Sequence, residues 1–273
     1  MDKVPEEFLF SIRGLIKKFP IGYTSSFPKS PGQEKSDNFK ALDGIDLDIS
    51  SGECLLIAGA NGSGKTLLTR ILAGLLVPTE GQCLYRGKPL KECKKIIRSQ
   101  VGLVFQDAQA QILGETVEED IRFGPENLKL PKEEIERLIE ETLCSLELTA
   151  KRDFPARHLS GGEKRRLGVA GVLAMGCETI IMDEPFANLD WPGVKQVLEI
   201  IQVLKQRKKT IVILTHELEK VLSLADRLVI LVAGRIKDSG EPEEVLNRLD
   251  PAWGVRDPRG AYSLSFPPTR ELP

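Results

Sequence analysis

Short apolar runs alternate with longer amphipathic stretches along most of the 273-residue chain. Apolar runs of about four to eight residues with many β-branched side chains predict buried strands. The clearest runs are ECLLIAG (53–59), VGLVF (101–105), TIIMD (179–183), TIVILTH (210–216) and RLVILVAG (227–234). Residues 133–148 and 191–209 have apolar positions at helical spacing, and Pro192 suits the first turn of the second helix. This alternation predicts an α/β protein with a largely parallel sheet.

Three segments interrupt the alternation. Residues 20–40 carry turn-forming residues without periodicity, so we expect a loop or an open hairpin there. Residues 107–165 are mostly helical in pattern and predict an inserted helical subdomain. Residues 251–273 hold 5 of the 17 prolines, which argues against regular structure in this tail. The aromatic residues of the tail, which we expect to dock on a protein surface, are Trp253, Tyr262 and Phe266.

Composition narrows the class of protein only slightly. With 41% hydrophobic residues, the chain can bury a full core in one large domain or two smaller ones. A net charge of -2 gives no electrostatic reason to expect binding to nucleic acid. No apolar run approaches the roughly 18 residues that span a bilayer, and the start MDKVPEEF is unlike a signal peptide, so we expect a cytosolic chain. The five scattered cysteines argue against a zinc site and a disulfide framework.

The sequence GANGSGKT (59–66) matches the phosphate-loop pattern G-x-x-x-x-G-K-[ST], between a predicted strand and an apolar helical pattern. Its glycines let consecutive N–H groups turn toward phosphate oxygens, and the following helix adds its positive N-terminal partial charge. Lys65 would reach the β- and γ-phosphates, and the Thr66 hydroxyl would bind Mg²⁺. The residues that we assign to this nucleotide site are Gly59, Asn61, Gly62, Ser63, Gly64, Lys65, Thr66 and Leu67.

A second motif, TIIMDEP (179–185), supplies acidic groups. Its apolar residues place Asp183 at the exposed end of a buried strand, where it can hold Mg²⁺ through a water molecule. Glu184 follows directly and could orient or deprotonate the attacking water. Together, the two motifs predict a nucleotide hydrolase or a kinase and nothing narrower.

The segment LSGGE (159–163) narrows the class, because it precedes TIIMDEP with a helical pattern between them. The order of phosphate loop, LSGGE, IIMDEP and a strand ending in His216 resembles the ATP-binding-cassette (ABC) ATPases over roughly residues 10–245. The resemblance implies a P-loop NTPase fold over residues 1–245, with a mostly parallel core sheet and an N-terminal antiparallel β subdomain. It also implies a helical subdomain inserted at about 107–177 and a C-terminal extension at 246–273.

Further site residues follow from this resemblance. Gln106 matches the family's glutamine loop, which senses Mg²⁺ and the attacking water, and His216 matches the histidine that contacts the γ-phosphate. In ANLD (187–190), Asp190 would lie at an interface between two cassettes. The adenine base would stack on Phe19, with Tyr23 as the rival.

LSGGE also has a purely structural interpretation. Ser160 at an N-cap with Glu163 three residues later forms a capping box, in which the Glu163 carboxylate folds back onto the Ser160 N–H. In the ABC family two cassettes pair head to tail, so this segment of one subunit faces the phosphate loop of the other. Its assigned ATP-binding residues are Ser160, Gly161, Gly162 and Glu163. Leu67 and Glu163 depart from the family, which more often has Thr or Ser and Gln there.

Within the family, residues 101–128 and 159–175 are similar to the energy-coupling factor (ECF) importers of vitamins and transition-metal ions. This similarity implies an ATPase subunit on the cytoplasmic face of the cell membrane, with ATP and Mg²⁺ as cofactors. Its partners would be a second ABC ATPase, either a copy or a paralogue, a transmembrane component and a substrate-binding component, and not nucleic acid.

Two questions remain open at this stage, the role of residues 107–128 and the type of ABC ATPase. On the importer hypothesis, residues 107–128 form a groove for a helix of the transmembrane component; otherwise they are a solvated surface helix with a turn at Gly124–Pro125. The chain could also be the ATPase of another ABC transporter type or a soluble ABC ATPase in translation or DNA repair. Such soluble proteins usually carry two cassettes or long coiled-coil insertions, and this chain has neither.

Overall fold

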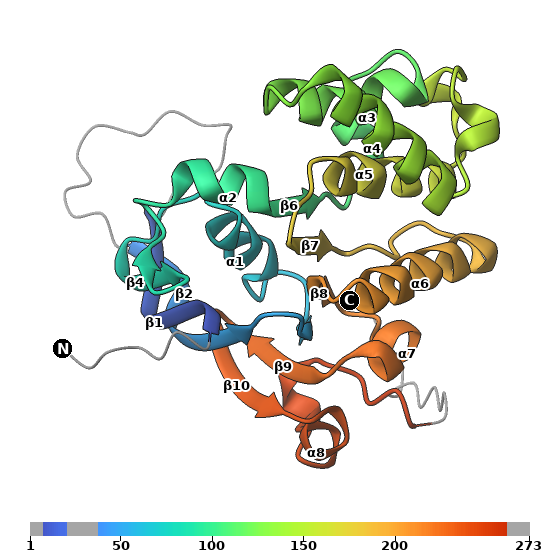
Figure 1. Cartoon of the computed structure of the whole chain (residues 1–273). Coiled ribbons are helices and arrows are strands. Elements are labelled where there is room, and N and C mark those ends of the chain that lie inside the picture. The colour runs from blue at the N-terminus through green and yellow to red at the C-terminus, as the bar shows by residue number, and fades with distance from the viewer. Residues whose placement is uncertain (1–7, 21–37, 261–273) are drawn as a thin grey trace, which may run out of the picture.

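Two sheets form the framework of the part that the computed structural model describes, residues 8–20 and 38–260 (Figure 1). The first sheet is antiparallel, with strand order β2-β1-β4-β5. Its strands are β1 (Phe8–Pro20), β2 (Asn38–Ser50), β4 (Glu80–Tyr85) and β5 (Lys88–Pro89). This sheet confirms the antiparallel N-terminal β layer that the family resemblance implies.

The second sheet has the order β10-β9-β3-β8-β7-β6. Neighbouring strands from β9 to β6 are parallel, and β10 is antiparallel at one edge. The strands are β3 (Cys54–Ala58), β6 (Val101–Val104), β7 (Thr179–Asp183), β8 (Thr210–Thr215), β9 (Arg227–Val232) and β10 (Arg235–Gly240). All five predicted strands are therefore present, and the prediction of a mostly parallel core sheet is confirmed.

The core sheet separates two hydrophobic clusters. Along β3, Cys54, Leu56 and Ala58 face one cluster, whereas Leu55 and Ile57 face the other, as the two-residue period of a strand requires. The cluster that Leu55 and Ile57 face includes apolar residues of the antiparallel sheet and of the helices α1 (Lys65–Leu72) and α2 (Lys94–Gln100). The cluster that Leu56 faces includes residues of α6 (Trp191–Gln206), α7 (Leu218–Val221) and α8 (Pro242–Asn247).

Three further helices lie between β6 and β7 in the chain and gather on one side of the molecule (Figure 1). They are α3 (Val117–Asn127), α4 (Lys132–Ser145) and α5 (Gly161–Ala174). The prediction of helices at this place is confirmed, as are the separately predicted helices that became α4 and α6. The exact limits of a helical subdomain, and of a domain at 1–245, stay predictions.

The turn at Gly124–Pro125, which belonged to the alternative interpretation of residues 107–128, is absent, because both residues lie inside α3. A Cβ at Gly124 would come within 2.4 Å of Met175 Cγ, so the missing side chain lets α3 approach the end of α5 closely. Pro125 lacks the N–H that would bond the Ile121 carbonyl, and α3 nevertheless continues beyond it to Asn127. Close helix packing therefore overrides the local turn signal.

The two segments predicted to be irregular are only partly described. β1 runs to Pro20 and pairs there with Asn38 at the start of β2, so the flanks of the 20–40 segment form an antiparallel pair. Residues 21–37 lie outside the described residues. In the C-terminal tail, Trp253 packs against the core and Val255 is buried, which confirms docking of this part.

The remaining tail aromatics, Tyr262 and Phe266, lie outside the described residues. No helix of the described part is long and apolar enough to cross a membrane.

The parallel register brings four chain segments to one edge of the core sheet. Strands β3, β8, β7 and β6 are neighbours and parallel, so their carboxyl ends lie along the same edge. The residues that follow these carboxyl ends include Gly59 after β3, His216 after β8, Glu184 after β7 and Gln106 after β6. In open α/β sheets, this edge is where ligand sites form.

Candidate functional site

The phosphate loop, residues 59–66, connects β3 to α1 and is packed too closely for side chains at two positions. A Cβ on Gly59 would lie 2.3 Å from the Leu231 carbonyl oxygen. Gly64 has a φ of 106°, and its Cβ would lie 2.7 Å from Leu42 Cδ2. Glycine is therefore needed here both for space and for a left-handed backbone.

Lys65, Glu184 and His216 form one contact chain beneath this loop. The Lys65 Nζ donates a hydrogen bond to the Gly59 carbonyl at 2.6 Å and lies 3.2 Å from Glu184 Oε1. The other carboxylate oxygen of Glu184 lies 3.0 Å from His216 Nδ1. Lys65 and Glu184 are each 6% exposed, so the charged pair is buried. Three residues predicted from separate motifs thus meet.

The backbone of Glu184 explains how its side chain reaches this place. Glu184 has a φ of 47°, in the left-handed region that non-glycine residues seldom adopt. Its N–H still donates to the Leu214 carbonyl of β8 at 2.8 Å, so the pairing of β7 continues through it. The left-handed residue then turns the carboxylate toward the ends of β3 and β8. Such strained residues concentrate at functional sites.

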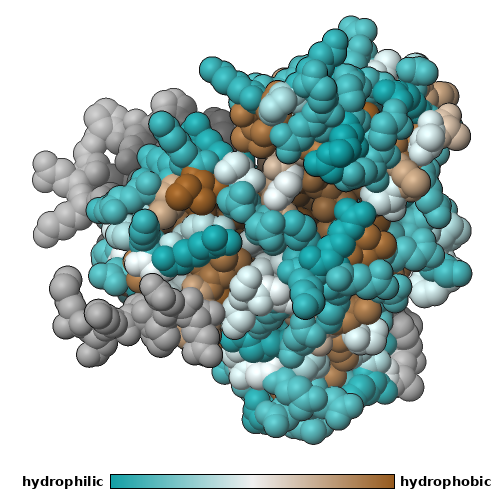
Figure 2. Space-filling view, in the orientation of Figure 1, coloured by the Kyte–Doolittle hydropathy of each residue, from teal (hydrophilic) through white to brown (hydrophobic). Residues whose placement is uncertain are grey.

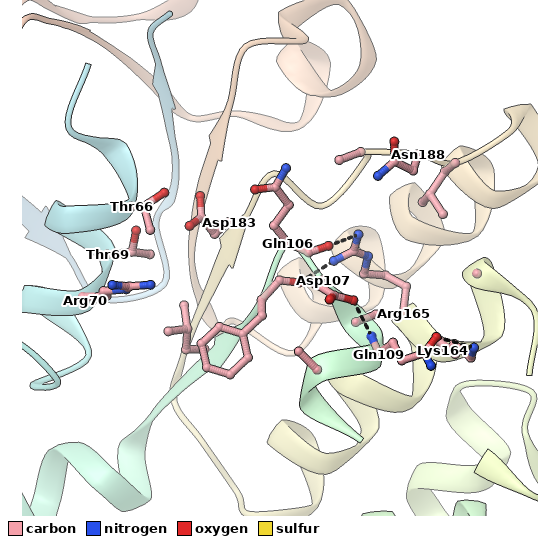
Figure 3. Close-up of a pocket in the computed structure, with 17 residues that line it drawn as sticks. Thr66, Thr69, Arg70, Gln106, Asp107, Gln109, Lys164, Arg165, Asp183 and Asn188 are labelled. Atoms are coloured by element: carbon pink, nitrogen blue, oxygen red, sulfur yellow. Dashed lines mark hydrogen bonds between the residues drawn. The ribbon is translucent and has the colours of Figure 1, made fainter. Parts of the chain in front are cut away.

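Asp183 lies beside the Thr66 side chain, and the two face one another across the site (Figure 3). The expectation of an exposed strand end is wrong, because Asp183 is only 6% exposed. Burial raises the pKa of Asp183, whereas a hydrogen bond with Thr66 acts in the opposite direction. Its Oδ1 has no hydrogen-bond partner among the described residues. A buried, unpartnered carboxylate oxygen beside a hydroxyl fits the oxygen ligands that Mg²⁺ prefers.

Gln106 reaches the same site from the end of β6. Its side chain extends toward Asp183 along the wall of a cleft of about 630 Å³, which also takes in Thr66 of α1 and Gly161 of α5 (Figure 3). The cleft therefore connects the phosphate loop with the segment that begins α5. The oxygen donors of Thr66, Asp183 and Gln106 lie on three different elements around it.

The start of α5 forms the predicted capping box. The Ser160 hydroxyl accepts a hydrogen bond from the Glu163 N–H at 3.3 Å, and the Glu163 carboxylate accepts one from the Ser160 N–H at 2.8 Å. That backbone hydrogen bond is the main reason why the pKa of Glu163 is lowered. Both predicted contacts are confirmed, and the Glu163 charge is directed back at its own helix.

A groove of about 410 Å³ joins this helix start to the segment 187–190. Ser160, Gly161 and Gly162 line one side of it, and Asp190 lines the other. Asp190 also caps α6, because its carboxylate accepts from the Gly193 N–H at 3.0 Å. The predicted interface residues thus form one continuous surface.

The remaining predicted residues occupy varied positions. Phe19 lies on β1, opposite Phe39 of β2, and its ring centroid is 5.3 Å from the Lys17 Nζ. Leu67 is partly buried and packs on the core. Asn61 lies in a groove with His216. Gly62 has a positive φ, and Ser63 is buried, while the rival Tyr23 lies outside the described residues.

Comparison with known proteins settles the family. Residues 42–187 match the family model described as ABC transporter, which is more than half of the chain. The chain belongs to the ABC transporter family. This ABC ATPase is 43% identical over 218 residues to a putative ABC transporter ATP-binding protein of Halobacterium salinarum, covering 80% of the chain and 94% of that relative.

Other relatives carry more specific names. The chain is 40% identical over 235 residues to the energy-coupling factor transporter ATP-binding protein EcfA of Methanocaldococcus jannaschii, covering 84% of each. Among solved structures, cbiO1 of Clostridium perfringens, described as part of the ABC transporter complex cbiONQ, matches with a TM-score of 0.75 and 32% identity. That match covers 88% of this chain and 91% of the other.

The dimeric ATP-binding cassette MJ0796, bound to ADP and Pi, matches with a TM-score of 0.71 but only 24% identity, and supports the fold alone.

Sequence reasoning missed one side chain of this ABC ATPase. Arg165 lines the cleft and donates hydrogen bonds to the backbone carbonyls of Phe105 and Gln106. It stood in a run of three cations, KRR (164–166), without a predicted role. A signal was available, because Arg165 lies three and four residues before the buried Gly168 and Val169 and so belongs to the buried face of α5.

Proposed function

We propose that this chain is the ATP-hydrolysing subunit of an ECF-type importer, bound to the cytoplasmic face of the cell membrane. The observation that carries the hydrolytic role is the contact chain of Lys65, Glu184 and His216 beside Asp183 and Thr66. The ECF branch is supported by the EcfA relative and by the structural likeness to cbiO1. By analogy, the transported substrate is a micronutrient, either a vitamin or a transition-metal ion.

In this proposal, the phosphate loop binds the triphosphate with its N–H groups, and Lys65 contacts the β- and γ-phosphates. Glu184 orients the attacking water and accepts its proton, because its carboxylate sits at the strand end between Lys65 and His216. His216 is half exposed, so its ring can contact the γ-phosphate while Nδ1 faces Glu184. Phe19 stacks on the adenine base.

Mg²⁺ would be held by Thr66, Asp183 and Gln106, whose side chains bring oxygen atoms to the cleft from α1, from the end of β7 and from the loop after β6. When bound, the ion neutralises charge on the β- and γ-phosphates. Because Glu184 directly follows Asp183, these residues would hold the ion close to the Glu184 carboxylate. This arrangement explains why Asp183 keeps a buried oxygen without a hydrogen-bond partner among the described residues.

A second ABC ATPase, either a copy or a paralogue, would complete the site. Because the Ser160 oxygen accepts from the Glu163 N–H, its own hydrogen is left to donate to a γ-phosphate held by the partner. Gly161 and Gly162 allow close approach, and Asp190 lies in the same groove. We therefore place the ATP contacts of this surface across a dimer interface.

The transmembrane component would bind at the segment after β6. Three large apolar residues of this segment are exposed: Phe105 (40%), Leu113 (62%) and Phe123 (49%). In the space-filling view, apolar residues show between the helical group and the sheet, on a face that is otherwise largely hydrophilic (Figure 2). Exposed apolar side chains of this kind fit the apolar face of an amphipathic helix. A separate substrate-binding component would complete the importer.

The test of the hydrolytic role is Glu184→Gln. We expect ATP-analogue binding to be retained and turnover to fall at least about a hundredfold, because the general base is lost. Glu178→Gln is the matched control, since Glu178 precedes β7 at its other end and is half exposed beside Lys209. It should turn over at close to the wild-type rate. Normal turnover of Glu184→Gln would contradict the assignment.

The test of the transport role is affinity purification from detergent-extracted membranes. An ECF-type subunit should bring down a transmembrane component and a separate small substrate-binding membrane protein. Recovery with a transmembrane partner alone would favour another ABC transporter type. Recovery without any integral membrane protein would contradict both transport hypotheses and favour a soluble ABC ATPase.

A further inference from the structure

Arg165 is an unusual side chain in this molecule, because it is charged, only 3% exposed and part of the wall of the ATP cleft. Its hydrogen bonds go to main-chain oxygens: one guanidinium nitrogen binds the Phe105 carbonyl, and the other binds the Gln106 carbonyl at 2.9 Å. Its Nε has no hydrogen-bond partner among the described residues. Burial lowers the pKa of Arg165, and the charge of Asp107 opposes this effect.

A buried cation that bonds only to carbonyl oxygens is costly to keep. Desolvation of a charge opposes folding, and neutral carbonyl groups compensate for it less than a carboxylate does. The advantage of Arg165 lies in the geometry that its hydrogen bonds impose on the backbone. The two planar N–H donors fix two consecutive carbonyl groups, and therefore the peptide planes on either side of Gln106. With these planes fixed, the Gln106 side chain leaves toward Asp183 (Figure 3).

Two further contacts attach the same segment to α5. Gln111 accepts a hydrogen bond from the Phe105 N–H at 3.1 Å and donates one to the Gly168 carbonyl of α5, also at 3.1 Å. The Lys164 Nζ lies 3.1 Å from the Gln109 side-chain oxygen. Residues 105–111 are therefore held at three points to the helix that begins at Ser160.

We propose that Arg165 is a positioning residue, which holds Gln106 at the Mg²⁺ side of the cleft and ties it to the helix that begins at Ser160. A displacement of α5, which carries Ser160 toward a partner subunit, then moves Gln106 through the Arg165 hydrogen bonds. This inference rests on the proposed role of Gln106 in Mg²⁺ binding and catalysis. It adds the side chain that sets the place of Gln106 and links it to the dimer surface.

The experiment is a double-mutant cycle with Arg165→Gln and Gln106→Ala. Arg165→Gln keeps a polar side chain but cannot fix two carbonyl groups at once. We expect it to lower kcat about ten- to hundredfold, because small displacements of catalytic groups have effects of this size. The Mg²⁺ concentration for half-maximal rate should rise in parallel, while the KM for ATP changes little. Arg165→Lys should restore part of the rate.

The double variant decides between positioning and a structural role. If Arg165 acts through Gln106, adding Arg165→Gln to Gln106→Ala should lower kcat no further. Arg166→Gln is the matched control, because the next residue points elsewhere and donates to the Leu146 carbonyl at 3.2 Å. Any effect of that variant should add to the effect of Gln106→Ala.

Three outcomes would overturn the proposal. Additive effects of Arg165→Gln and Gln106→Ala, or an unchanged Mg²⁺ requirement in Arg165→Gln, would reduce Arg165 to a structural residue while leaving Gln106 in its role. A normal rate and Mg²⁺ requirement in Gln106→Ala would instead remove the role of Gln106, and the inference with it. If thermal unfolding shows that Arg165→Gln is unfolded at the assay temperature, Arg165→Lys carries the same cycle, because it keeps the buried cation.

Discussion

Buried charge distinguishes the site residues from the rest of the core. Lys65, Asp183 and Glu184 are each 6% exposed, although charged side chains are almost never so buried unless they are paired. Lys65 and Glu184 pair with one another, whereas Asp183 keeps one oxygen without a hydrogen-bond partner among the described residues. Groups of this kind oppose folding and are retained for function. The consequence can be measured at Asp183.

Asp183→Asn should raise the melting temperature at neutral pH and abolish Mg²⁺-dependent ATP hydrolysis. Burial raises the pKa of Asp183 above its ordinary value of 3.8, so the folded protein binds this proton more tightly than the unfolded chain. Above the raised pKa, the ionised carboxylate therefore lowers the stability of the fold by its full amount. This destabilisation disappears as the pH falls below the raised pKa toward the ordinary value.

The measurement for Asp183→Asn is thermal unfolding without nucleotide or Mg²⁺, at neutral pH and in acid. The melting temperatures of variant and wild type should converge as the pH falls. A variant that melts below the wild type at neutral pH would show that Asp183 stabilises the fold.

Glu163→Gln separates the cap from its charge. Gln keeps the capping-box hydrogen bond but loses the carboxylate's attraction to the helix N-terminus and to the Lys151 Nζ, which lies 3.8 Å away. We expect these losses to total about 0.5 kcal/mol at neutral pH. The lowered pKa of Glu163 means that its contribution is present above its ordinary value of 4.5 and disappears as pH falls through the lowered one. Urea unfolding should show a difference in unfolding free energy between wild type and Glu163→Gln at neutral pH, and this difference should disappear in acid.

The ATPase rate of Glu163→Gln should stay close to that of the wild type. The Glu163 carboxylate is directed back at the Ser160 N–H, so its charge is turned away from an incoming phosphate. A large increase in rate would mean that the glutamate weakens the site.

At the scale of elements, the strands of the core sheet were predictable because they are short, apolar and buried on both faces, as β3 and β8 are throughout. The capping box at Ser160 was predictable because its contacts span three residues. Contacts between residues far apart in the sequence were not predictable in this way. The cost of burying Arg165 is compensated by carbonyl groups about sixty positions away in the chain, and no local pattern encodes such a contact.

The turn at Gly124–Pro125 illustrates the same limit. Its residue types favour a turn, but contact with Met175, about fifty positions later, favours a continuous helix. Tertiary packing decides between them. The phosphate loop is the opposite case, because its residues are contiguous and their chemistry is set by the backbone that they form.

Gly102→Ala tests how closely α5 is packed on β6. A Cβ on Gly102 would lie 2.0 Å from Val172 Cγ1, so the alanine forces the helix and strand apart. We expect a loss of about 1–3 kcal/mol in unfolding free energy from overpacking. Val172→Ala should destabilise on its own by leaving a cavity, yet restore stability when combined with Gly102→Ala. Urea denaturation of all four proteins measures this coupling, and strictly additive losses would contradict the contact.

At the scale of the whole molecule, the proposed function gives one chain two different halves of an ATP site. The phosphate loop and Asp183 lie at one end of the cleft, and Ser160 lies in the surface groove with Asp190. Next to that groove stands Trp191, which is 65% exposed. A large exposed aromatic residue beside a polar groove favours contact with a partner. Since Trp253 is the only other tryptophan of the chain, Trp191 offers a spectroscopic probe of assembly.

Ser160→Arg should bind ATP but fail to assemble. In a Glu184→Gln background, ATP should double the mass measured by light scattering and change the fluorescence of Trp191. The arginine removes the capping hydroxyl, at about 1 kcal/mol, and fills the groove with a long cation, so the second chain cannot close on it. The phosphate loop of the same chain is untouched, so titration with a fluorescent ATP analogue should give the parental affinity.

Ser239→Arg, at an exposed position of β10, is the control for adding an arginine, and should assemble like the parent. Trp191→Phe in the same background should assemble without the fluorescence change, which assigns the signal to this residue. If Ser160→Arg still doubles its mass with ATP, the surface groove is not the contact, and the site does not need a second chain at Ser160. Loss of assembly with unchanged ATP affinity would instead separate nucleotide binding from dimer closure, the division of labour that the two halves of the site predict.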